Sequence, residues 1–157
     1  MYIIQNKLTI GLALVVISFL APASGGDIEK AIEARQGWYQ IISHNTGLMF
    51  SMAKGKTEYN AEIALMAAKN LQILNRLNNS YLWPPESSKD WMPGKTRALE
   101  EIWSTYPAFL DKINAYNSAV DDLVPVAGLG LDALRSKLPA LGNSCKGCHT
   151  KFRARSF

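Results

Sequence analysis

Two cysteines and a histidine lie together near the end of the sequence, in the run Cys145-Lys146-Gly147-Cys148-His149. Thiols at this spacing can form thioether bonds to the two vinyl groups of a haem, and the adjoining imidazole can then bind the iron from one face. On a helix these side chains span just over one turn, so all three can face one porphyrin. The sequence therefore predicts one covalently attached haem c per chain, held by Cys145 and Cys148, with His149 as an iron ligand.

The same Cys-x-x-Cys spacing also occurs in redox dithiols, disulfides and zinc sites. A thioredoxin-like motif requires a strand–helix–strand setting, and a structural zinc site requires further Cys or His ligands. This sequence contains two Cys in all, and its other histidine, His44, lies about a hundred residues upstream. Haem attachment is therefore favoured over a dithiol or disulfide, and both are favoured over zinc.

The first residues have the composition of a secretory signal peptide. A polar start with Lys7 is followed by an apolar run over 8–20 and by small residues over 21–26. The apolar run is too short for an ordinary transmembrane helix, and an uncleaved membrane anchor is the alternative interpretation. We expect a cleaved signal peptide over 1–25, a single domain over 26–157, a periplasmic location and no membrane association after cleavage.

The predicted mature chain is slightly basic. The 16 Lys and Arg that remain without Lys7 outnumber the 13 Asp and Glu by three. They are dispersed apart from a small cluster at Lys146, Lys151, Arg153 and Arg155, and nucleic-acid binding would need a denser stripe or a recognisable motif. We expect no nucleic-acid partner, and the cluster is either a rim that steers an acidic redox partner protein or an ordinary charged helix end.

Helices are predicted wherever the apolar residues of the mature chain recur. Helical spacing covers 28–53, then 61–77 with Asn60 as the expected N-cap, then about 104–126 with Pro107 in the first turn. No strand-like alternation occurs in the mature chain. The predicted fold is all-α, an antiparallel four-helix bundle that carries the covalent haem.

The fourth predicted helix begins near Leu131 and carries the haem motif. Pro139 and Gly142 lie inside it, so we expect a kink or a broken first segment there. Residues 81–96 are rich in Pro, Ser and Trp, and this composition predicts an ordered crossover loop between the second and third helices.

The sixth coordination position of the iron decides between two kinds of function. A strong Met or His ligand makes an electron carrier, whereas a weak or absent ligand leaves the iron open to small gases. The candidates include the aromatic residues, His44 and the methionines Met49, Met52, Met66 and Met92. Each Met taken singly is better explained as a residue that fills the core.

Motifs from all four predicted helices occur together and in order. They are Arg35-Gln36-Gly37-Trp38-Tyr39, Lys54-Gly55 with Tyr59-Asn60-Ala61, Lys95-Thr96-Arg97 with Glu101-Ile102-Trp103, and the haem motif with Phe152-Arg153. Together they resemble cytochrome c prime, the high-spin class II cytochromes c, over essentially the whole mature chain. Class I cytochromes c instead carry the haem motif near the N-terminus. Glu100, where the family often has proline, and Pro139 are modest departures.

The resemblance implies roles for residues of the first helix and the crossover. Arg35 and Gln36 are expected to hold the haem propionates, with Thr96 or its neighbours Lys95 and Arg97 contributing from the crossover. Tyr39 is expected to cover the distal face. A charge-assisted bond to a carboxylate suits Arg35. An ordinary core tyrosine is the alternative role for Tyr39.

Spacing suggests a role for Arg153, which lies four residues after His149. Its guanidinium is either a cover for the proximal side and the haem carboxylates or an ordinary cation in the last helical turn. Low-spin class II relatives place a Met ligand on the first helix, but no Met occurs between Asp27 and Leu48. We therefore expect five-coordinate, high-spin iron.

The first functional hypothesis is a non-enzymatic haem protein that binds nitric oxide or carbon monoxide behind an apolar cover. The second is an electron carrier, and a low-spin cytochrome with a sixth protein ligand is the alternative form of it. A peroxidase-like activity lacks support, because no distal His and Arg pair can be assigned. The resemblance also implies a homodimer through the first two helices.

Overall fold

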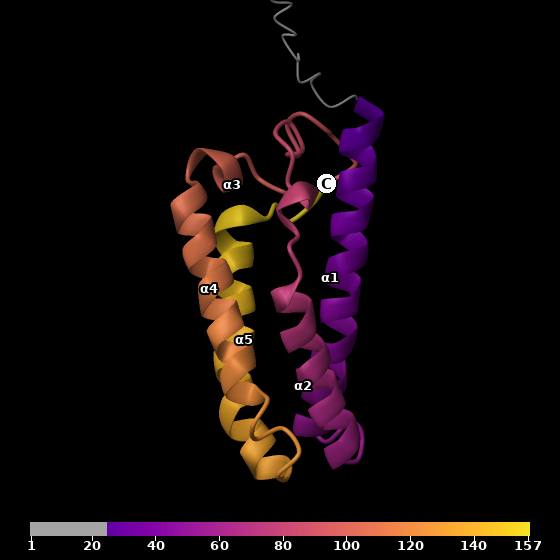
Figure 1. Ribbon diagram of the computed structural model, residues 1–157, viewed down its shortest axis with the longest axis vertical. Coiled ribbons are helices and arrows are strands. Elements are labelled where there is room, and N and C mark those ends of the chain that lie inside the picture. Colours follow the sequence, from indigo (N-terminus) through magenta and orange to yellow (C-terminus); the bar gives the residue numbers. More distant parts are fainter. Residues whose placement is uncertain (1–24) are drawn as a thin grey trace, which may run out of the picture.

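Residues 25–157, the part of the chain that the computed structural model describes, fold into four long helices with shorter elements between them (Figure 1). They are α1 (Gly25–Ala53), α2 (Ala61–Arg76), α4 (Tyr106–Leu123) and α5 (Leu131–Phe152). A 3-10 turn, η1 (Ser80–Leu82), and a short helix, α3 (Glu101–Ser104), lie in the crossover between α2 and α4. The predicted signal peptide falls on residues 1–24 almost entirely and so lies outside the described residues.

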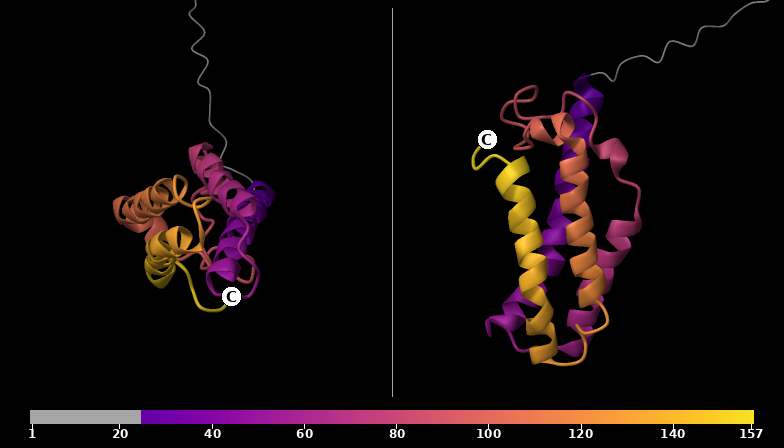
Figure 2. Two further views of the ribbon diagram at one scale, coloured as in Figure 1. Left: turned by 90° about the horizontal axis from the view of Figure 1, so that it is seen from below. Right: turned by 90° about the vertical axis from the view of Figure 1, so that its left-hand side faces the viewer.

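Each long helix runs antiparallel to the one that follows it along the chain. α1 packs against α2 and α5, and α4 packs against α5 and α2, which closes the four helices into a ring around a shared interior. Figure 2 shows this ring from one end and the long crossover on its outside. The predicted all-α four-helix bundle is confirmed. Within residues 25–157 no helix is long and apolar enough to cross a membrane.

The start signals of two helices act as predicted. The Asn60 side chain accepts a hydrogen bond from the Ile63 backbone N–H at 2.9 Å, which satisfies one of the free donors at the start of α2. Pro107 lies in the first turn of α4, where its missing N–H breaks no helical bond.

Two helix boundaries differ from the expectation. The third long helix ends at Leu123 rather than near residue 126, because Pro125 cannot donate to a carbonyl one turn back. The sequence also gave no sign of α3, a single turn that breaks before α4 begins.

The broken segment expected in the fourth helix is absent, since α5 is unbroken through Pro139 and Gly142. Pro139 leaves the carbonyl of Arg135 without its helical donor, and both residues are exposed, so water can bind that carbonyl. A Cβ at Gly142 would lie 3.3 Å from Phe50 Cζ, so this glycine allows close packing against α1.

The core has two parts of different chemistry. An aliphatic cluster fills one end of the bundle and includes Met49, Leu71, Leu123 and Leu138. At the other end Ile102, Phe109 and Phe152 form a second buried cluster, against which Trp83, Trp103 and Cys148 pack. The haem motif therefore lies at the aromatic end of the bundle.

Candidate haem-binding site

The thiols and the imidazole of the haem motif share the last turns of α5. Cys145 and Cys148 are both free and half-buried, whereas His149 is exposed. Burial raises the pKa of Cys148 to about 11 and raises the pKa of Cys145 as well. Redox-active cysteines have lowered pKa values, so this environment argues against the dithiol interpretation. Within residues 25–157, no three His, Cys, Asp or Glu side chains are grouped to hold a metal ion by themselves.

The surroundings of His149 favour its neutral form. Burial lowers its pKa, and the charge of Arg97 lowers it further. A neutral imidazole keeps a lone pair for a metal, which is the form that iron ligation requires. The residues present therefore suit an iron ligand at this position.

Arg153 lies beside His149, as its spacing predicted. Arg153 Nη1 lies 3.4 Å from His149 Nδ1, and its backbone N–H bonds to the His149 carbonyl at the end of α5. A guanidinium can only donate, so this contact needs a lone pair on Nδ1 and places the ring proton on Nε2. Ligation through Nε2 would move that proton to Nδ1, and Arg153 could then no longer donate to it.

Tyr39 of α1 lies in the electrostatic range of the thiols on α5. Its side chain is 38 % exposed, and burial of the remainder, followed by the charge of Cys148, raises its pKa above the ordinary range. Its ring meets Trp83 edge to face, with 6.3 Å between the centroids. Tyr39 is therefore a neutral phenol held by an aromatic neighbour, which suits a side chain that covers a cofactor.

Arg35 is the centre of a buried hydrogen-bond network that ties the crossover to α1. Its side chain is 4 % exposed. Nη1 donates to Leu82 O at 3.2 Å and Ser87 Oγ at 3.1 Å, and Nη2 donates to Ser87 O at 3.0 Å and Thr96 Oγ1 at 3.1 Å. The guanidinium also lies over the Trp83 ring, 4.4 Å from its centroid. The structure thus joins two predicted site residues, Arg35 and Thr96, to each other.

The charge of Arg35 has no anionic partner among these contacts. All four acceptors are neutral, and burial lowers the pKa of Arg35 to about 10. An anionic group nearby would stabilise this cation, and a haem propionate has the required charge. The terminal nitrogens of Arg35 already donate four hydrogen bonds to acceptors of the crossover. A hydrogen bond from Arg35 to a haem propionate therefore stays a prediction.

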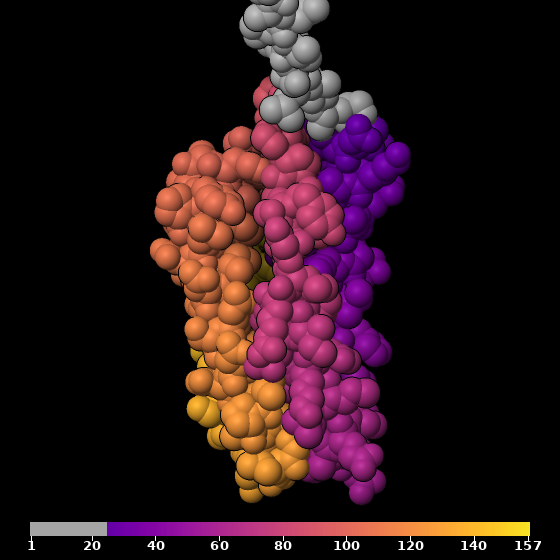
Figure 3. Space-filling view, in the orientation of Figure 1, coloured from indigo at the N-terminus to yellow at the C-terminus, as the bar shows by residue number. Residues whose placement is uncertain are grey.

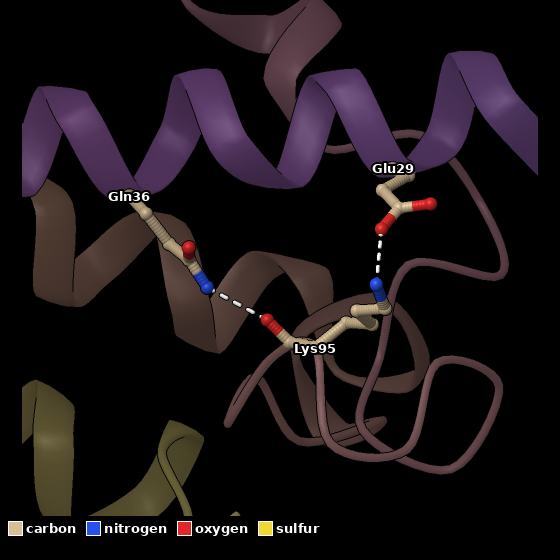
Figure 4. A network of polar contacts seen from close by, with 3 residues as sticks. All are labelled: Glu29, Gln36 and Lys95. Atoms are coloured by element: carbon tan, nitrogen blue, oxygen red, sulfur yellow. Dashed lines mark hydrogen bonds and ion pairs between the residues drawn. The ribbon is translucent and has the colours of Figure 1, made fainter.

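Gln36 and Lys95 add a second connection between α1 and the crossover (Figure 4). Gln36 Nε2 donates to the Lys95 carbonyl at 2.7 Å, while Lys95 Nζ pairs with the Glu29 carboxylate. Both contacts lie on the exposed side of α1. Gln36 therefore lies near Thr96, as expected, although its amide is engaged by the loop.

A buried phenol near the thiols lacks a partner. Tyr116 of α4 has a buried hydroxyl without a hydrogen bond, and its pKa is raised by burial and then by the charges of Cys145 and Tyr39. Figure 3 shows a hollow in the surface between α4 and the segment after α2, with α5 at its floor. An unpaired hydroxyl in this region fits a site completed by a group with polar edges.

Four of the candidates for a sixth iron ligand lie away from the thiols, whereas Met92 lies half-buried in the crossover. Met49 and Met52 are buried in the aliphatic cluster, and Met66 is 50 % exposed on α2. His44 is exposed and lines a groove of about 430 Å³ at the α1–α2 junction with Leu48 and Ile63. The interpretation of these methionines as core residues is confirmed for Met49 and Met52.

Several residues around the site were not singled out from the sequence. Trp83 and Ser87 contact Arg35, and Tyr116 lies within electrostatic range of Cys145. The only signal for Trp83 was the expectation that its loop packs. The others are separated from their partners by many residues, so no spacing rule could have found them.

Known proteins match most of this chain. A family model described as Cytochrome C' matches residues 30–153. Cytochrome c' of Cereibacter sphaeroides is 34 % identical over 144 residues, which covers 92 % of this chain and 96 % of that protein. The solved structure of cytochrome c' from Rhodobacter Spheriodes superposes with a TM-score of 0.79 at 34 % identity, covering 82 % of this chain and 98 % of that one.

One further structure is of a ligand complex. The nitric oxide complex of a variant of cytochrome c prime from Alcaligenes xylosoxidans superposes with a TM-score of 0.69 at 28 % identity. The match covers 82 % of this chain and 97 % of that one.

Proposed function

Because the chain belongs to the cytochrome c' family, whose members carry covalently attached haem c, we propose that it binds nitric oxide or carbon monoxide at an iron with one open axial position. The observation that carries the proposal is that Tyr39 lies within electrostatic range of both thiols, whereas Met49 and Met52 are buried in the aliphatic cluster. When bound, haem c would supply the iron that takes up the gas, and His149 would be the residue that holds this iron. The chain supplies the cysteines that attach the haem, the side chain that covers the gas-binding side and the charged side chains around the haem.

Tyr39 would act as the cover of the gas-binding side. Its raised pKa keeps the phenol neutral, so the cover brings no charge to the ligand. The nearby cation of Arg35 uses its terminal N–H groups on the crossover, which leaves fewer donors for a polar ligand. An uncharged surface of this kind favours neutral diatomic molecules over a polar oxygen complex. The nitric oxide complex of the Alcaligenes xylosoxidans relative supports the same ligand class.

Electron transfer is the second candidate function, because the imidazole of His149 is exposed at the basic end of α5. A low-spin form with a Met ligand has less support. Met49 and Met52 pack with Leu71 and Leu123, so either would have to leave the aliphatic core to reach an iron. The resulting cavity would destabilise the bundle. Neither function includes a catalytic reaction.

Absorption and electron paramagnetic resonance spectra of the purified ferric protein test the open position. We expect high-spin signals and no charge-transfer band from a methionine sulfur to iron. A low-spin, six-coordinate spectrum would contradict the proposal. The predicted export is tested separately, by the N-terminal mass of protein recovered from the periplasm, which should start between residues 24 and 26.

We also propose a homodimer through α1 and α2. Ile63, Met66 and Ile73 follow one another at helical spacing on α2, and Leu77 caps its end. Each of these four is at least 39 % exposed, and Ile41 on α1 is 50 % exposed. An apolar stripe of this kind indicates a covered surface. Sedimentation velocity should give a dimer for the wild type and a monomer for Met66→Lys. A monomeric wild type would refute the proposal.

A further inference from the structure

A group of cations lies at the carboxyl end of α5, where the imidazole of His149 is exposed. Lys146, Lys151, Arg153 and Arg155 are exposed and come from the end of α5 and the segment after it. Two half-buried cations join them from other elements, because Arg97 of the crossover acts on His149 and Lys112 of α4 acts on Cys148. We call these six residues the α5 cation cluster: Arg97, Lys112, Lys146, Lys151, Arg153 and Arg155.

Backbone hydrogen bonds hold Arg97, the member of this cluster that comes from the crossover, beside the end of α5. The segment after α5 forms a bridge at Ala98 and Arg153, with Leu99 N–H donating to Phe152 O at 3.1 Å and Ala154 N–H donating to Arg97 O at 2.8 Å. The Arg97 guanidinium in turn lies over the Phe157 ring, 5.3 Å from its centroid. Arg97, more than fifty positions away in sequence, is therefore held next to the end of α5.

The members of the cluster have no carboxylate partners within residues 25–157. The ion pairs found over residues 25–157 join Lys89 to Asp90, Lys95 to Glu29, Arg135 to Asp132 and Lys137 to Asp122, and none includes a cluster member. The sequence has no Asp or Glu after Asp132. The helix dipole favours cations in the last turn of α5, but it does not explain Arg97 and Lys112, which belong to other elements. Like charges that gather without partners create a strong local potential.

We propose that the α5 cation cluster is the docking surface for an acidic electron-transfer protein that exchanges one electron with the haem on the His149 side. The step moves one electron from the reduced partner to the ferric haem, and no bond or proton changes place. This docking role rests on the electron-transfer part of the proposed function and is independent of gas binding. The electron would then enter on the His149 side, away from Tyr39.

Stopped-flow reduction of the ferric holoprotein by flavodoxin hydroquinone tests this surface. Flavodoxin is an acidic protein, and its hydroquinone anion becomes the neutral semiquinone when it gives up one electron. The cluster variant combines Lys146→Gln, Lys151→Gln and Arg155→Gln. The control variant makes the same charge change at exposed cations outside the cluster, with Lys54→Gln, Lys56→Gln and Lys69→Gln.

At about 10 mM ionic strength we expect the cluster variant to be reduced at least about tenfold more slowly than the wild type and the control. Its rate should also lose most of its dependence on salt. Equal rates for the two variants, or a wild-type rate that rises with salt, would overturn the proposal. The proposal would also be overturned if phosphate at constant ionic strength abolished the difference in rate between the cluster variant and the wild type. The cluster would then be a site for small anions.

A binding measurement separates docking from the chemistry of the haem. Titration calorimetry with oxidised flavodoxin should show binding to the ferric wild type and the control at low salt, and none to the cluster variant. Absorption spectra and carbon monoxide binding rates should be equal in all three proteins. If the ferric spectrum proves low-spin while the cluster variant still loses docking, the gas-binding proposal fails and the docking proposal stands. Binding that survives in the cluster variant refutes docking alone.

Discussion

Replacement of Arg35 by Met is expected to loosen the crossover from α1. Arg35→Met keeps a side chain of similar reach but removes the four hydrogen bonds to the backbone and hydroxyl groups of Leu82, Ser87 and Thr96. Two of the four acceptors are carbonyls that cannot turn away, whereas the two hydroxyls can rotate to other partners. The cost therefore falls mainly on the carbonyls of Leu82 and Ser87.

The size of the effect follows from the burial of this network. Each buried acceptor that loses its partner costs about 1–3 kcal/mol, and removal of the buried cation returns part of the cost of its desolvation. We expect the free energy of unfolding to fall by about 3–5 kcal/mol in total. For a domain of this size that corresponds to a fall in Tm of about 10–15 °C.

Thermal and urea unfolding of the ferric protein, followed by far-UV circular dichroism, measure this loss. Thr96→Val should cost about 1–2 kcal/mol, and the double variant should cost less than the sum of the two. Lys30→Met, an exposed cation on the same helix, is the control and should change stability by no more than about 0.5 kcal/mol. A loss below about 1 kcal/mol for Arg35→Met, or strict additivity with Thr96→Val, would refute the role of Arg35 as an anchor of the crossover.

Three other predictions concern the cover, the phenols and α5. Tyr39→Ala should speed carbon monoxide and nitric oxide binding by about tenfold or more in flash photolysis, whereas unchanged rates would show that Tyr39 is an ordinary core residue. Because the pKa values of Tyr39 and Tyr116 are raised, the folded protein keeps their protons above about pH 10 while the unfolded chain loses them. The contribution of each phenol to stability is therefore complete below that pH and is lost as the pH rises further. Absorbance at 295 nm follows the ionisation of tyrosines. Tyr39→Phe and Tyr116→Phe should leave the increase of this absorbance near pH 10 unchanged until the chain unfolds. Pro139→Ala should raise the free energy of unfolding by up to about 3 kcal/mol in urea, since it restores a helical hydrogen bond at an exposed position, and a loss of stability would contradict this account.

The haem motif, the helices and most helix boundaries could be predicted from the sequence because their signals are local. The side chains of Cys145, Cys148 and His149 share a turn of one helix, and Asn60 caps the helix that begins at the next residue. Arg35 and Thr96 were linked through a family resemblance, and their direct contact could not have been foreseen from spacing. They are 61 residues apart and meet because the crossover folds back on α1.

The unbroken course of α5 shows where local rules fail. Proline penalises a helix interior, but Pro139 and Arg135 are both exposed, so water can reach the freed carbonyl, while Leu138 and Leu141 anchor α5 in the core. Arg97 is a second case, since its place beside His149 depends on the pairing of two distant segments. Such contacts follow from the complete packing, which no window of the sequence contains.

The environment of the two thiols constrains the order of events in assembly. With a pKa of about 11, Cys148 in the closed bundle would be thiolate in only about one molecule in ten thousand at neutral pH, against a few per cent for an exposed cysteine. Thioether formation needs reactive sulfur and room for the porphyrin, and the segment after α5 is already pinned to residues 97–99 in the folded chain. We therefore expect the haem to be attached before the bundle closes.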